Sequence, residues 1–334
     1  MEQIFRVGID NYSLFPMNLE PVKVMKWARQ NGAEGVAFSG LQPGDTYPDR
    51  GYLRALTEYA KENNLYLEWG GARHIPRDMN SWSRKDLFEH NRRCAREAET
   101  IGTRIVRSCS GGLMRWNPAN PSTKTLLGET ADALRDQKQM LMDHDVILAI
   151  ETHFEFTTFE LLRIFEMCGA SPGEFLGICL DTMNLLIMLE DPVKASERIL
   201  PWVVSTHIKD GGIIWNDKGL TAFPVETGTG IVDLGRIVEL LRNLEYPVNL
   251  SVEDHGGEFL MPVFDPVFLS EFPDLGTSEF IRLSELAEAT RQKINNGEIA
   301  PLSRDIWPDI CENRVIKDIA NVRELVSEIY GNHV

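Results

Sequence analysis

Short apolar runs alternate with longer amphipathic stretches along almost the whole chain. Most of the apolar runs are rich in Val, Ile, Leu or Phe. Continuous apolar strands of this kind are typical of a parallel sheet that is covered on both faces. The pattern therefore predicts eight strands, over residues 6–12, 35–40, 65–71, 104–112, 146–153, 175–182, 203–210 and 248–255.

The stretches between these strands carry the start and stop signals of helices. Pro21 opens an amphipathic run that Gly32 closes, which is the usual order of these two residues at helix ends. Ser83 and Thr157 each begin a sequence typical of a capping box. Asp191, followed by proline, predicts another helix start. Helices are therefore expected in the segments that connect the strands.

Strict alternation of eight strands with helices predicts a (β/α)8 TIM barrel. An open doubly wound sheet is the alternative, but it does not naturally hold all eight strands in one layer with polar groups at their carboxyl ends. We expect a barrel domain over residues 1–290 and a C-terminal helical extension over 291–334 that packs on the barrel or on a partner. The segments 211–230 and 256–276 predict long loops after strands seven and eight, where barrels commonly place functional loops.

Composition excludes several classes of protein. The 334 residues carry a formal net charge of −16, so nucleic acid and anionic membranes are not expected partners. The apolar runs are too short to span a membrane, and no signal peptide is visible at the N-terminus. The five cysteines are scattered and form no CxxC pair, which indicates reduced thiols and a cytoplasmic protein.

Four successive strands end in groups that commonly bind metals. These are Glu151, Asp181, His207 and Glu253, on the fifth to eighth predicted strands. Since barrel strands present their carboxyl ends at one mouth, we expect the four side chains to converge there. Three carboxylates and one imidazole would suit Mn²⁺, with Co²⁺ or Mg²⁺ as alternatives. Each residue taken alone is equally well explained as a solvated polar group at a strand end.

These strand ends resemble a known family. The segments AIET, CLDTMN, STHIKD and SVED, with the glycine-rich segment 226–241, are similar to the xylose isomerase-like TIM barrels that include sugar phosphate isomerases and epimerases. The resemblance covers roughly residues 5–290. It implies that the four residues are metal ligands, and that Glu151 and Glu253 also move protons on either side of the substrate.

The resemblance also implies a reaction type. A divalent metal would act as a Lewis acid on a sugar carbonyl and stabilise the enediolate that follows proton abstraction. Isomerisation, epimerisation or elimination can then follow. At three positions where ketose epimerases of the family carry a His, an Arg and a Glu, this chain has Asn184, Ile213 and Thr157, which argues against a simple ketohexose epimerase.

Two features favour another branch of the family. His153 lies two residues after Glu151, on the same side of the strand, where it could act as a second base or merely donate a hydrogen bond to Glu151 or to a backbone carbonyl. The segment 256–276 is rich in Phe, Leu and Met. With the sequence HIKDGG, these features are similar to the large subunit of C-glycoside deglycosidases. That branch implies elimination from a 3-keto glycoside, a small β-subunit partner and a homo-oligomer.

Other functions remain open at this level. A sugar isomerase or 3-epimerase is the main alternative, and a non-catalytic assembly subunit is a third reading. A DNA-repair endonuclease of the same fold would need more zinc ligands than seven histidines supply here, and a basic face. Five further residues near the predicted strand ends are candidates for substrate contact, although packing or salt bridges would also explain them: Trp69, Arg107, Asn184, Lys209 and His255.

Overall fold

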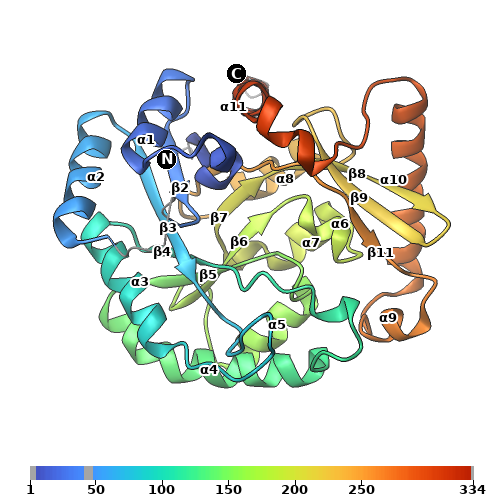
Figure 1. Cartoon of the computed structure of the whole chain (residues 1–334), viewed down its shortest axis with the longest axis horizontal. Coiled ribbons are helices and arrows are strands. Elements are labelled where there is room, and N and C mark those ends of the chain that lie inside the picture. Colours follow the sequence, from blue (N-terminus) through green and yellow to red (C-terminus); the bar gives the residue numbers. More distant parts are fainter. Residues whose placement is uncertain (1–4, 41–47, 332–334) are drawn as a thin grey trace.

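A computed structural model describes residues 5–40 and 48–331. Eight parallel strands form a closed barrel in the order β1-β10-β7-β6-β5-β4-β3-β2, which confirms the predicted (β/α)8 fold (Figure 1). The strands are β1 (Val7–Asp10), β2 (Gly35–Phe38), β3 (Tyr66–Ala72), β4 (Ile105–Ser108), β5 (Ile147–Glu151), β6 (Leu176–Asp181), β7 (Val203–Ile208) and β10 (Leu250–Val252).

Helices surround the barrel and bury its outer face. They are α1 (Pro21–Gln30), α2 (Arg50–Glu62), α3 (Phe88–Ile101), α4 (Thr123–Asp143), α5 (Thr158–Met167), α7 (Pro192–Ile199), α8 (Leu234–Arg242) and α11 (Trp307–Gly331). The short helix α6 (Asn184–Ile187) lies instead at the mouth of the barrel. Short 3-10 turns occur at Asn11–Met17, Met114–Trp116, Leu200–Trp202 and Arg304–Ile306. None of the helices in the described part of the chain combines the length and the apolar character needed to cross a membrane.

Local capping explains where some helices begin. Thr157 forms the predicted capping box with Glu160 at the start of α5, and the side chain of Asp191 accepts a hydrogen bond from Lys194 N at the start of α7. The prediction at Ser83 is wrong, because α3 begins only at Phe88. The chain before α3 is held instead by an antiparallel bridge between Arg77 and Arg84.

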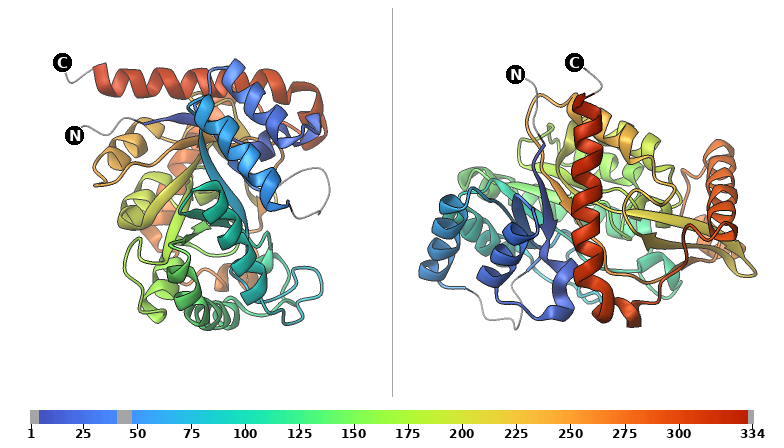
Figure 2. Two further views of the ribbon diagram at one scale, coloured as in Figure 1. Left: turned by 90° about the vertical axis from the view of Figure 1, so that its left-hand side faces the viewer. Right: turned by 90° about the horizontal axis from the view of Figure 1, so that it is seen from above.

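The C-terminal helix α11 packs on the first and last strands of the barrel. It contacts both β1 and β10 and runs along one side of the molecule (Figure 2). Trp307, at its first turn, is fully buried and donates a hydrogen bond from Nε1 to the carbonyl of Ser13, 3.0 Å away. The helix therefore covers the seam where the two ends of the sheet meet. A domain boundary near residue 290 stays a prediction.

The segment 211–230 is not the long loop that we expected. It contains an antiparallel hairpin of β8 (Asp210–Asn216) and β9 (Gly219–Val225), which β11 (Phe259–Met261) extends to a three-stranded sheet. The hairpin turns at Asn216, whose side chain accepts hydrogen bonds from Lys218 N and Gly219 N. The helices α9 (Pro266–Ser270) and α10 (Thr277–Asn295) complete this insertion, and α10 packs against β8.

Polar side chains fill part of the barrel interior beneath its mouth. The Tyr66 hydroxyl lies 2.8 Å from Ser251 Oγ, and Asn249 Nδ2 donates to Glu68 Oε1 over 2.7 Å. A Cβ at Gly35 would lie 2.1 Å from the Tyr66 ring, so only glycine leaves room for that ring. Since successive strand residues alternate in direction, Tyr66 and Glu68 point inward and the residues between and after them point outward.

Candidate metal centre and active-site cavity

The four predicted metal ligands meet at the mouth of the barrel. Glu151 ends β5, Asp181 ends β6, His207 lies opposite Asp181 on β7, and Glu253 directly follows β10. These strands are neighbours in the barrel. One ligand atom from each residue lies within 4.8 Å of the others, and all four side chains are buried. The structure thus brings together the residues that the strand ends predicted.

His207 has the geometry of an imidazole prepared to bind a cation. Its Nδ1 lies 3.4 Å from Glu151 Oε1 and 3.7 Å from Glu253 Oε1, and it has no hydrogen-bond partner although it is buried. Its Nε2 lies 3.3 Å from Oδ2 of Asp10, at the end of β1. Asp10 also accepts a hydrogen bond of 2.6 Å from the Ser39 hydroxyl. A carboxylate on the far nitrogen orients the ring and leaves Nδ1 facing the cluster.

The electrostatics of the cluster favour a positive charge at its centre. Burial opposes protonation of His207, but the negative potential of Cys179, Glu253 and Glu151 raises its pKa well above the ordinary value. A divalent cation could supply that charge in place of a proton. Three carboxylates with one nitrogen donor fit Mn²⁺, Co²⁺ or Mg²⁺. The unpartnered Nδ1 and the converging oxygens therefore form a cluster that could bind such an ion.

Two buried cations flank the carboxylates. Arg107, on β4, forms an ion pair with Glu151, and Lys209 Nζ lies 2.5 Å from Glu253 Oε2 and 3.2 Å from Asp181 Oδ2. Burial would raise the pKa of Glu151, but Arg107 and His207 outweigh it and hold that pKa below the ordinary value. Lys209 is fully buried, so the alternative of a surface salt bridge is wrong.

A cavity of about 410 Å³ opens above this cluster. Most of the predicted substrate contacts line it, including Asn184, whose backbone N–H also donates to Asp181 Oδ1 over 2.8 Å. His255 Nε2 lies 3.1 Å from Lys209 Nζ. The side chains that line the cavity are Tyr12, Ser39, Arg73, Arg107, Cys109, Glu151, His153, Phe154, Asn184, Lys209, Glu253, His255, Phe259 and Arg304, together with Gly111.

Trp69 does not reach the cavity, and its assignment as a substrate contact is corrected. It is buried, and its indole nitrogen donates to Glu97 Oε2 on α3 over 3.0 Å. The neighbouring Glu68 points into the barrel, so strand alternation directs Trp69 to the helix layer. Trp69 is therefore a packing residue between β3 and α3.

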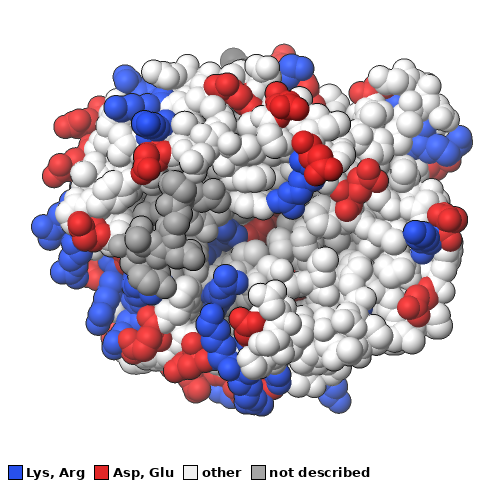
Figure 3. Space-filling view, in the orientation of Figure 1, with Lys and Arg blue, Asp and Glu red and all other residues white. Residues whose placement is uncertain are grey.

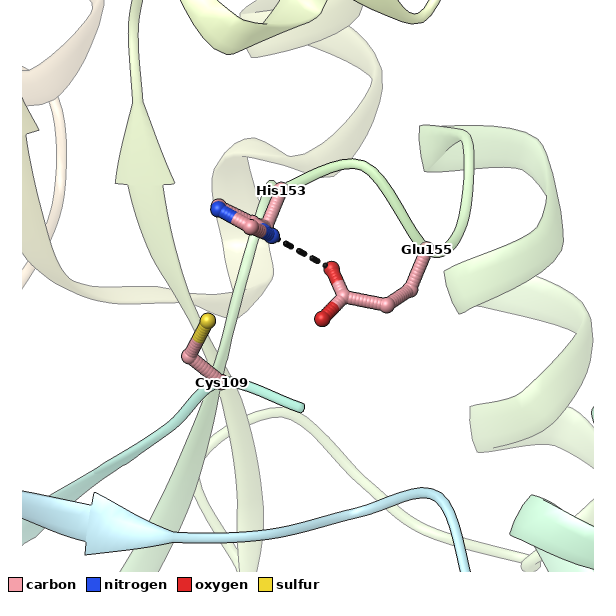
Figure 4. Close-up of side chains that lie close together, drawn as sticks. All are labelled: Cys109, His153 and Glu155. Carbon is pink, nitrogen blue, oxygen red and sulfur yellow. Dashed lines mark hydrogen bonds and ion pairs between the residues drawn. The ribbon is translucent and has the colours of Figure 1, made fainter. Parts of the chain in front are cut away.

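His153 belongs to a second group of side chains at the edge of the cavity (Figure 4). Its Nδ1 lies 2.8 Å from Glu155 Oε2, and Cys109 lies close enough for the three to form a compact Cys, His and Glu cluster. Glu155 also accepts a hydrogen bond from the backbone of Gly111. Glu155, rather than Glu151 or a backbone carbonyl, therefore orients the His153 ring.

Several residues of the site carried no clear sequence signal. Asp10 follows the short apolar run of β1 and could have been found as a fifth polar strand end, while Ser39 follows β2. Arg73 lies in an irregular segment, Arg304 begins a short 3-10 turn before α11, and Glu155 lies beyond the end of β5. None of these segments has a periodicity that points a side chain toward the mouth.

Known proteins resemble this chain in sequence and in fold. The 3-oxo-isoapionate decarboxylase of Pectobacterium atrosepticum is 30% identical over 262 residues, which cover 74% of this chain and 84% of that protein. A solved structure of L-ribulose 3-epimerase superposes with a TM-score of 0.57 and 18% identity, over 93% of this chain and 97% of that one. A 3-keto-D-glucoside 4-epimerase from E. coli gives a TM-score of 0.55 at 15% identity, over 84% and 100%.

The match to a family model covers most of the barrel. The model described as xylose isomerase-like TIM barrel matches residues 25–266, which include all four members of the buried ligand cluster. The four strand-end segments that resembled this family in the sequence each contain one member of that cluster. The chain belongs to the xylose isomerase-like TIM barrel family.

Proposed function

We propose that this protein is a divalent-metal-dependent enzyme that forms an enediolate from a 3-oxo sugar derivative. The observation that carries the proposal is the convergence of Glu151, Asp181, His207 and Glu253, with a buried and unpartnered His207 Nδ1. A divalent cation held there would supply Lewis acidity toward a carbonyl and its neighbouring hydroxyl. Mn²⁺ is the metal that we expect.

The surrounding residues would manage charge and protons. Lys209 and Arg107 each pair with a carboxylate of the cluster, so they would stay close to an oxygen that becomes negative during the reaction. Glu151 and Glu253 lie on two sides of the cluster and are the pair we assign to proton transfer. His153 lines the same cavity and would exchange a proton with the substrate from its edge.

Decarboxylation is the reaction that we favour. In a 3-oxo acid, the bond between the carboxylate and the adjacent carbon breaks, CO2 leaves, and the electron pair passes into the carbonyl to give the enediolate. A proton, which His153 at the edge of the cavity would donate, then adds to that carbon and gives the ketone. The name of the relative from P. atrosepticum, a 3-oxo-isoapionate decarboxylase, supports this choice.

Elimination from a 3-keto glycoside is the second candidate. Phe154 and Phe259 pack at a centroid distance of 4.7 Å and both line the cavity, which would give an apolar aglycone a surface to contact. A small β-subunit and a homo-oligomer stay predictions. Among the described residues, four of the eight exposed large apolar side chains lie on the insertion, where such a partner could cover them: Trp215, Phe264, Val267 and Ile281.

Turnover of three substrates tests these candidates. The purified protein, loaded with Mn²⁺, is incubated with 3-oxo-isoapionate, with a 3-keto glucoside and with D-fructose. We expect CO2 release from the acid only, while aglycone release would favour elimination and sugar interconversion would favour an isomerase or epimerase. Glu151→Gln should abolish turnover without unfolding the protein, whereas Glu298→Gln, an exposed acid, should not. An active Glu151→Gln variant would remove Glu151 from the chemistry.

A further inference from the structure

The cavity is basic although the chain as a whole is acidic. Four cationic side chains line it against two carboxylates, Glu151 and Glu253, in a protein whose formal net charge is −16. The cations are Arg73, Arg107, Lys209 and Arg304. Around the central hollow of the face seen in Figure 3, Lys and Arg side chains lie beside Asp and Glu side chains, so the excess of cations is a property of the cavity lining. A bound divalent cation would make this cavity still more positive.

The four cations fall into two pairs. Arg107 and Lys209 each form ion pairs with members of the metal cluster. Arg73 and Arg304, by contrast, have no carboxylate within 4.0 Å among the residues that the structure describes. Unpaired guanidinium groups beside a cavity are suited to bind an oxyanion, because arginine presents several N–H donors in a fixed plane.

Arg73 is held in place by its surroundings. Its backbone N–H donates to Asn91 Oδ1 over 3.0 Å, and its carbonyl accepts from Asn91 Nδ2 over 2.7 Å. Its guanidinium donates through Nη1 to the carbonyl of Ser110, 3.1 Å away. One N–H thus fixes the group while its other donors are left for a ligand. A fixed guanidinium loses less conformational entropy when it binds.

Arg304 approaches the cavity from the C-terminal segment. Its guanidinium donates to the Tyr12 hydroxyl and lies 5.8 Å from the Tyr12 ring centroid and 5.9 Å from that of Phe15. Tyr12 in turn contacts His255 edge-on, with ring centroids 5.6 Å apart. The buried Trp307 anchors the same segment three residues later. Arg304 is therefore positioned by the aromatic side chains of Tyr12 and Phe15, in the segment that follows β1.

We infer that Arg73 and Arg304 form an oxyanion subsite that binds a carboxylate of the substrate, so that the enzyme takes sugar acids in preference to neutral sugars. The inference rests on the proposed function, and it assigns the part of the same cavity that recognises charge. Electrostatic complementarity of this kind discriminates strongly between a charged ligand and a neutral one of similar size. Through Arg304, the segment just before the C-terminal helix α11 would also take part in substrate binding.

Binding of a matched acid and polyol tests the inference. L-Threonate and L-threitol have the same number of carbons, and their affinities for the Mn²⁺-loaded protein are measured by titration calorimetry. Arg73→Met and Arg304→Met should each weaken threonate binding by about tenfold or more and leave threitol binding unchanged. Arg73→Lys should recover part of the loss. Arg236→Met, which removes an exposed arginine paired with Glu239, is the matched control.

The outcomes separate this inference from the proposed function. Unchanged threonate affinity in both variants, or equal losses for threonate and threitol, would overturn the oxyanion subsite. Inorganic phosphate is tested in parallel, and phosphate that binds more tightly than threonate through the same two arginines would overturn the assignment to a carboxylate. Absence of Mn²⁺ binding in the unmodified protein would instead overturn the proposed function. Thermal melting of each variant verifies that it is folded.

Discussion

The first four strands of the barrel and the last four have the same repeating form, yet they end in different chemistry. The last four supply the possible metal ligands Glu151, Asp181, His207 and Glu253. The first four, with the segments that follow them, supply groups that contact those ligands or face the cavity: Asp10, Ser39, Arg73 and Arg107.

This difference suggests a division of work across the mouth. Asp10 orients His207 from the opposite end of the sequence, and Arg107 holds Glu151. A cluster of like charges needs such partners, because an unpaired buried carboxylate is costly. The second half of the barrel would therefore bind the ion, and the first half would fix the geometry and charge around it.

The largest expected effect comes from a ligand of the second half. Asp181→Asn removes one negative charge from the centre of the cluster and leaves Lys209 with one carboxylate instead of two. Loss of one partner in a buried ionic cluster costs about 3–5 kcal/mol, so Mn²⁺ affinity should fall at least about a hundredfold by calorimetry. Asp217→Asn, in the exposed hairpin turn, should bind Mn²⁺ normally. A loss below tenfold would show that Asp181 is not a ligand.

Two buried histidines, one in each half of the barrel, have pKa values that are shifted in opposite directions. Burial lowers the pKa of His74, after β3, from 6.5 to about 4, whereas that of His207 is raised. Below pH 6.5 His74 binds a proton in the unfolded protein but stays neutral in the folded protein. The free energy of unfolding therefore decreases as the pH falls from 6.5 to 4, by up to about 3 kcal/mol.

His74→Asn removes this contribution. Urea unfolding at pH 7 should show the variant to be less stable than the unmodified protein, because the Nδ1 contact with Ser108 Oγ at 2.9 Å is altered. The difference between the two proteins should shrink by up to about 3 kcal/mol at pH 4. Parallel pH dependences for the two proteins would contradict the neutral, buried state of His74.

A smaller effect is expected from the first half. Asp10→Asn keeps the shape of the side chain but weakens its hold on His207 Nε2. Changes to a group that orients a metal ligand typically reduce metal affinity by about 10–100-fold, and we expect Mn²⁺ binding to fall within that range. Equal losses for Asp10→Asn and Asp181→Asn would erase the distinction between the two halves.

The smallest effect is expected at Trp69. Trp69→Phe loses the hydrogen bond to Glu97 and some packing, at a cost of about 1 kcal/mol in unfolding free energy. Affinities for Mn²⁺ and threonate should not change, because the side chain faces the helix layer. A selective loss of threonate binding would restore Trp69 as a substrate contact.

The barrel was predictable because its signals are local. Each strand is a short apolar run, and each ligand of the cluster stands at the end of one. The hairpin of β8 and β9 was missed because its strands pair with each other and lie outside the closed barrel. Its signal was present in the apolar residues on both sides of Asn216 and Gly219, which suit a hairpin turn.

The rest of the site depends on contacts that no local pattern encodes. Asp10 meets His207 only because the barrel closes, with β1 beside β10 and β10 beside β7. Arg73, in an irregular segment, and Arg304, in a short 3-10 turn, are far apart in the chain, and both line the cavity only in the folded protein. Trp69 was misassigned because strand position alone does not reveal which of two neighbouring residues faces inward.

The pairing of β1 with β10 also has a consequence for biosynthesis. Val7 pairs with Leu250, so the first strand leaves the ribosome long before its neighbour exists. At about 5–20 residues per second, one edge of the nascent sheet waits roughly 10–50 s for its partner. Until β10 has been synthesised, the backbone N–H and C=O groups on that edge of β1 stay unpaired, and an unpaired strand edge of this kind is where a nascent chain is prone to pair with another strand.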